Sequence, residues 1–72
     1  MTPTTADRRR ERIEDLARRV GAEYGEMPGL QLTSAQARCL FDLETTVCEE
    51  VLETLCERRI LRRRSDGQFV RV

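Results

Sequence analysis

The chain of 72 residues is long enough for one small domain, and its 39% hydrophobic content recurs in regular patterns, which favours folding over disorder. Thirteen acidic residues balance thirteen basic residues, all of them arginine. The chain contains no apolar stretch as long as a membrane span, and its first residues lack the apolar core of a targeting peptide. We therefore expect a cytoplasmic protein without a membrane partner.

The balanced net charge hides a separation of charge along the chain. Residues 1–22 carry six arginines and four acids, residues 23–57 carry one arginine and eight acids, and residues 58–72 carry six arginines and one acid. Such opposite balances predict a molecule with basic ends and an acidic middle.

The first predicted element is a helix that follows a polar lead. Residues 1–5 are expected to form a disordered lead to a single domain spanning residues 1–72, and Thr5 suits the position that caps a helix. Apolar residues then recur at spacings of three or four, as on one helix face: Ile13, Leu16, Ala17, Val20 and Tyr24. This helix should end near Gly25. A partly exposed part of its apolar stripe would suit a homodimer formed through the first helix.

A brief strand and a second helix are predicted next. Residues 30–32 alternate in polarity, as a short strand does. Thr33 or Ser34 suits the cap of the second helix, and Gln36 follows at the spacing of a capping box. This helix should run to about residues 40–41.

A third helix and a β-hairpin complete the chain. After a tight connection over residues 42–44, the helix is predicted from Thr45 to about Arg59, with one buried face: Val47 or Cys48, Val51, Leu52, Leu55 and Cys56. Two β-prone runs, residues 60–64 and 68–72, flank Ser65-Asp66-Gly67, and Asp-Gly between such runs indicates a hairpin. Either Phe69 or Val70 can face the core while the arginines face water.

The predicted order is helix, short strand, helix, helix and β-hairpin, a mainly α fold with a small β-hairpin in the α+β class. This is the order of a winged helix-turn-helix domain, and the stretch from Leu32 to Arg64 resembles that of bacterial winged-helix regulators. The chain is also similar to a group of small uncharacterised bacterial winged-helix-like proteins. The shared motifs are Met-Pro-Gly-Leu-x-Leu-Thr-x-x-Gln-Ala from Met27, Cys-x-x-Val-Leu-x-x-Leu from Cys48, and an Arg-rich Asp-Gly hairpin.

Two positions depart from the regulator pattern. The turn between the second and third helices usually holds a glycine where this chain has Asp42, and aspartate tolerates a left-handed backbone better than most residues. A small residue is usual at the position of Arg38, so the arginine is expected to disturb the close packing of the second helix on the third.

The resemblance implies a DNA-binding protein that regulates transcription. In helix-turn-helix proteins the start of the recognition helix enters the major groove, while a basic wing can follow the phosphate backbone. The residues predicted to contact nucleic acid are Thr45, Thr46, Glu49, Arg62, Arg63, Arg64 and Arg71. Arginines on an edge strand also protect against aggregation, so the wing arginines have a purely structural interpretation as well.

The acidic third helix supports an alternative function. Glu49, Glu50 and Glu53 would face outward, and phosphates repel carboxylates. The alternative is a winged-helix protein–protein interaction module that uses this acidic helix and does not bind DNA.

Neither catalysis nor a metal site is expected. The chain has no histidine, no lysine and no Gly-rich phosphate loop, which leaves few groups for acid–base or nucleophilic chemistry. Cys39, Cys48 and Cys56 form no Cys-x-x-Cys pair, and they are interpreted as reduced thiols in the core. We therefore predict a protein that is not an enzyme and has no cofactor.

Overall fold

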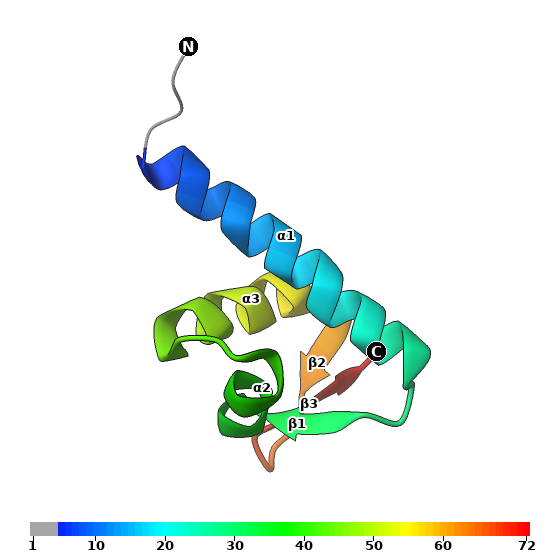
Figure 1. Cartoon of the computed structure of the whole chain (residues 1–72). Helices are drawn as coiled ribbons and strands as arrows, with labels where there is room; N and C mark the ends of the chain where they lie inside the picture. The colour runs from blue at the N-terminus through cyan, green and yellow to red at the C-terminus, as the bar shows by residue number, and fades with distance from the viewer. Residues whose placement is uncertain (1–4) are drawn as a thin grey trace.

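In a computed structural model that describes residues 5–72, the chain forms three helices and a three-stranded antiparallel sheet (Figure 1). The helices are α1 (Thr5–Glu26), α2 (Ser34–Phe41) and α3 (Thr45–Glu57), and the strands are β1 (Gln31–Thr33), β2 (Leu61–Arg63) and β3 (Gln68–Arg71). The predicted α+β class and the order of the elements are confirmed. The prediction did not include the pairing of β1 with β3, which extends the hairpin into a sheet of order β1-β3-β2.

Helix α1 packs on the rest of the molecule through its C-terminal half. Ile13, Ala17, Val20 and Tyr24 are buried, which confirms the predicted stripe, while Leu16 is half-buried. Residues 7–12 are exposed, and this half of the helix projects past the other elements (Figure 1). Residues 1–4 of the expected lead lie outside the described residues, and the expectation is wrong for Thr5, which is the first residue of α1. The homodimer formed through α1 stays a prediction. Leu16, the half-buried residue of the stripe, would lie in its interface.

Helix α2 begins with the predicted capping box. The Thr33 hydroxyl accepts a hydrogen bond from the Gln36 amide at 3.2 Å, and the Gln36 side chain accepts one from the Thr33 amide at 2.9 Å. Beyond the end of the helix, Asp42 adopts a left-handed conformation with φ 54°. The expectation that Arg38 disturbs the packing of α2 on α3 is wrong. The Arg38 side chain is exposed, and α2 places Ala37 in the core instead.

Helix α3 supplies the centre of the core. Its buried residues are Val47, Cys48, Val51, Leu52 and Leu55, while Cys56 is half-buried. The helix ends at Glu57, two residues before the predicted end. The Arg59 amide donates to the Cys56 carbonyl at 3.0 Å, and the Ile60 amide donates to the Leu55 carbonyl at 2.9 Å. This pair of bonds is a Schellman motif with Arg59 in the left-handed position, at φ 59°.

Replacing Arg59 by glycine is expected to stabilise the protein. A side chain in the left-handed region costs roughly 1–2 kcal/mol, and the extra freedom of glycine in the unfolded chain offsets part of the gain. We expect Arg59→Gly to raise the free energy of unfolding by about 0.5–1 kcal/mol in urea titrations. Glu57→Gly, the same replacement inside the helix, should lower it by about 1 kcal/mol. Destabilisation by both variants would contradict a strained Arg59.

The sheet places one face toward the helices and one face outward. β3 is the central strand, and its register pairs Phe69 with Leu32 of β1 and with Arg63 of β2. Leu61 and Phe69 face the core, whereas Val70 lies on the opposite face and is still only 8% exposed. Both predicted alternatives for the inward residue are therefore buried, on different faces. The Tyr24 hydroxyl donates to the Phe69 carbonyl at 2.9 Å and joins α1 to the sheet.

The hairpin turn has the predicted Asp-Gly chemistry. Gly67 has φ 85°, where a side chain would be strained, and its amide donates to the Arg64 carbonyl at 3.0 Å. The Asp66 carboxylate accepts a hydrogen bond from the Gln68 amide at 3.0 Å. These local bonds set the register of β2 and β3, and with it the face on which each arginine lies.

Candidate functional site

The residues predicted to contact nucleic acid are all exposed but lie on different parts of the surface. Thr45, Thr46 and Glu49 are in the first turns of α3. Arg71 is near the end of β3 that is remote from the turn. The three hairpin arginines, Arg62, Arg63 and Arg64, are divided between the two faces of the sheet by strand alternation.

Arg63 lies on the core-facing side of the hairpin, beside α3. Its guanidinium carbon is 5.9 Å from the centre of the Phe69 ring, within the range of a cation–π contact. Arg62 and Arg64 lie on the outer face, where the register places Arg62 beside Val70. Arg64 donates a long hydrogen bond of 3.4 Å to the side chain of Gln31, across the sheet. The period-two alternation of a strand could have separated Arg63 from its neighbours in the sequence.

A groove of about 190 Å³ separates α3 from the hairpin. Its lining residues are Ser34, Glu49, Leu52, Glu53, Arg63, Gly67 and Phe69. Glu49 and Glu53 are one helical turn apart, so both carboxylates border the same groove. Leu52 and Phe69 line the groove but are only 1% and 9% exposed, and Arg63 contributes a positive charge on the opposite wall.

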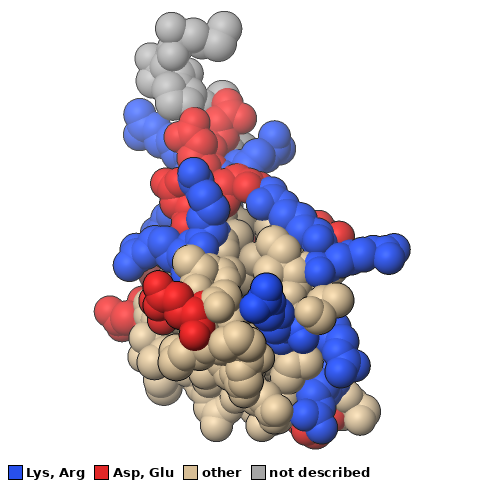
Figure 2. Space-filling view, turned by 90° about the vertical axis from the view of Figure 1, so that its right-hand side faces the viewer, with Lys and Arg blue, Asp and Glu red and all other residues tan. Residues whose placement is uncertain are grey.

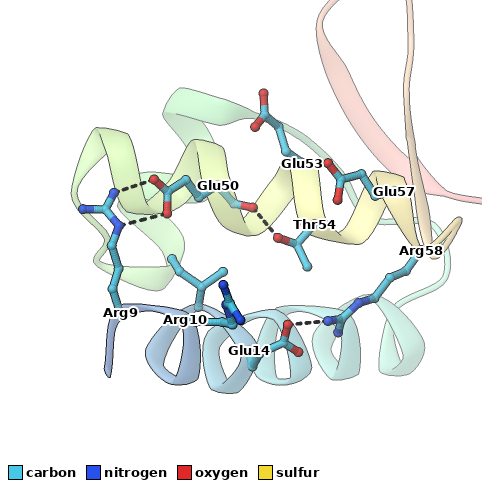
Figure 3. A pocket seen from close by; sticks show the side chains of 9 residues that line it. Arg9, Arg10, Glu14, Glu50, Glu53, Thr54, Glu57 and Arg58 are labelled. Atoms are coloured by element: carbon cyan, nitrogen blue, oxygen red, sulfur yellow. Dashed lines mark hydrogen bonds and ion pairs between the residues drawn. The ribbon is translucent and has the colours of Figure 1, made fainter. Parts of the chain in front are cut away.

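A second groove of about 430 Å³ lies between α1 and α3 and is bridged by two ion pairs (Figure 3). Arg9 donates to both carboxylate oxygens of Glu50, and Arg58 donates to Glu14. The hydrogen bond from Arg58 holds the pKa of Glu14 below its usual value, and the bond to Glu50 raises the pKa of Arg9. Glu50, which the sequence placed on the open acidic face, is therefore engaged by α1. No local signal predicts a pair of residues 41 positions apart.

Three glutamates of α3 form an exposed acidic stripe: Glu49, Glu53 and Glu57. Their spacing of four residues places them on one side of the helix. Glu53 and Glu57 also line the groove between α1 and α3 (Figure 3). None of the three forms an ion pair within residues 5–72. The sequence-based prediction did not include Glu57, although the repeated spacing was a signal for it.

The charges also separate over the surface of the molecule. Figure 2 shows acidic and basic side chains interleaved along the projecting end of α1. On the body below, most basic side chains lie along the right-hand edge and in the middle of the face, and most acidic side chains lie toward the left-hand edge. The basic and acidic side chains of this face therefore concentrate on different parts of it.

The three cysteines have three different environments. Cys48 is buried, and its thiol donates to the Ser34 carbonyl at 3.6 Å, while Cys56 is half-buried. Burial raises the pKa of both thiols. Cys39 is exposed on α2 beside Leu40, so the prediction of a core position is wrong for this residue. Within residues 5–72, no group of three or more potential ligand residues could hold a metal ion.

None of the described helices combines the length and the apolar character needed to cross a bilayer. No protein-family model, no curated protein and no solved structure matches the chain. A functional conclusion therefore rests on the surface chemistry of the chain itself.

Proposed function

We propose that this domain is a protein-interaction module in which the acidic stripe of α3 binds a cationic segment of a partner protein. The main observation that supports this proposal is that Glu49, Glu53 and Glu57 share one exposed side of α3 and form no ion pair among the described residues. Three aligned carboxylates create a negative potential that attracts arginine or lysine side chains.

The order of the elements supports a winged helix-turn-helix architecture, with α3 as the recognition helix and the β2–β3 hairpin as the wing. In DNA-binding members of that architecture, this helix approaches the phosphates of the major groove. Here Glu49 and Glu53 occupy that side of α3, and they would repel the phosphates. The acidic groove therefore favours a cationic partner over DNA.

DNA binding is the second candidate function, and one observation favours it. Arg62 and Arg64 are exposed on the same outer face of the hairpin, where their guanidinium groups can contact a phosphate backbone. In this case the hairpin would supply most of the affinity, and Thr45 and Thr46 would contribute from the separate α3 side.

Fluorescence anisotropy distinguishes the two candidates. The probes are a labelled Arg-rich peptide and a labelled mixed-sequence DNA duplex, each titrated at low and physiological salt. We expect the peptide to bind and the stripe variant, Glu49→Gln/Glu53→Gln/Glu57→Gln, to weaken its binding about tenfold or more. A control variant, Glu11→Gln/Glu23→Gln/Glu26→Gln, removes the same charge from α1 and should change binding by less than about twofold.

Equal losses in the stripe and control variants would show that only net charge matters and would contradict the proposal. Salt-sensitive duplex binding that disappears in Arg62→Gln/Arg64→Gln, together with no peptide binding, would support the DNA candidate instead.

A further inference from the structure

The outer face of the sheet presents two arginines, Arg62 and Arg64, and neither forms an ion pair with a carboxylate of α3. Helices α1 and α3 lie on the other side of the sheet (Figure 1), and Arg62 and Arg64 alternate away from it. The carboxylate of Asp66 is 3.8 Å from the Arg64 guanidinium, whereas Arg62 forms no ion pair within residues 5–72. This face is therefore a cationic surface that is open to an acidic occupant from outside the chain.

The acidic stripe of α3 matches this surface in both charge and spacing. Arg62 and Arg64 are two residues apart on a strand, a separation of about 6.6–6.8 Å between their Cα atoms. Successive stripe glutamates are four residues apart on a helix, a rise of about 6 Å. Two neighbouring arginines can thus meet two neighbouring glutamates when a strand lies along the helix. Because Arg62 and Arg64 alternate away from the sheet face on which Arg63 meets Glu49 and Glu53, such a contact joins different molecules.

We propose that the occupant of this sheet face is a second copy of the chain, whose acidic stripe binds Arg62 and Arg64. The inference rests on the proposed function, because it identifies the cationic segment that the stripe binds. The contact is heterologous, since it uses a different surface on each molecule and leaves one surface of each kind open at the two ends. Its energy is mainly that of exposed ion pairs, so the association is weak and sensitive to salt.

Sedimentation velocity on two complementary variants tests this contact. The stripe variant keeps the arginines but lacks the acidic surface, and the strand variant, Arg62→Gln/Arg64→Gln, keeps only the acidic surface. We expect the natural protein at low salt to sediment faster as its concentration rises, and each variant alone to remain monomeric. An equimolar mixture of the two variants should form a complex of about twice the monomer mass and nothing larger, because one productive contact remains. Arg8→Gln/Arg12→Gln, which removes the same charge from the projecting end of α1, should behave as the natural protein does.

A mixture that stays monomeric would overturn the inference, as would self-association of either variant alone at the level of the natural protein. Peptide binding by the strand variant separates the two proposals. If the strand variant binds the Arg-rich peptide while the mixture stays monomeric, the proposed function holds and the self-association does not. If the strand variant does not bind the peptide, the proposed function fails as well. Loss of duplex binding in the strand variant, with no self-association of the natural protein, would assign the sheet face to nucleic acid.

Discussion

Leu55→Ala is expected to lower the free energy of unfolding by about 3 kcal/mol, because it leaves a cavity where α3 packs against its neighbours. Leu55 is 1% exposed, and its side chain lies against α1 at Gly21, where an added Cβ would be 3.5 Å from the Leu55 methyl. A domain of this length has a total stability of roughly 4–11 kcal/mol. The variant should therefore be partly unfolded at physiological temperature, or close to it.

Urea unfolding followed by circular dichroism measures this loss. The matched control is Leu40→Ala, which removes the same atoms from a side chain that is 56% exposed, and its effect should stay within about 0.5 kcal/mol. Equal effects of the two replacements would show that Leu55 does not lie in a close-packed core.

Raising the pH through the range from about 10 to about 12 is expected to destabilise the protein by roughly 2–3 kcal/mol through Tyr24 alone. Tyr24 is completely buried, and burial raises the pKa of its hydroxyl to about 12, while the hydroxyl donates to the Phe69 carbonyl at 2.9 Å. The pKa of tyrosine in an unfolded chain is about 10. Because the folded pKa is the higher one, this stabilisation is complete below the unfolded pKa and is lost as the pH rises through the folded pKa. The thiols of the buried Cys48 and the half-buried Cys56, whose pKa values are also raised, add to the same loss at high pH.

Tyr24 is the single tyrosine of the chain, and the chain has no tryptophan, so the absorbance of tyrosinate reports this residue directly. Absorbance and urea unfolding measured together from pH 8 to 12 should show tyrosinate appearing as stability falls. Tyr24→Phe should be about 1–2 kcal/mol less stable at neutral pH, since the Phe69 carbonyl loses its donor, but should lose less stability at high pH. A stability profile parallel to that of the natural protein would contradict this role for Tyr24.

Features that depend on neighbouring residues could be predicted from the sequence. The capping box of Thr33 and Gln36, the left-handed Asp42 and the turn at Gly67 each involve groups within a few positions of one another. Helical periodicity likewise identified the buried faces of α1 and α3. The spacing of the glutamates was sufficient to predict an acidic side of α3, although Glu57 was not included.

Features that depend on contacts between distant segments were decided only by the tertiary structure. The engagement of Glu50 by Arg9, the pairing of β1 with β3 and the exposure of Cys39 all follow from how the helices and strands pack, and no local pattern encodes that packing. The amino-acid sequence by itself determined the helices, the hairpin and the separation of charge, because these follow from local periodicity and composition. The tertiary structure decided which of those charges are neutralised within the chain and which remain open to a partner, because that depends on the distances between segments far apart in the sequence.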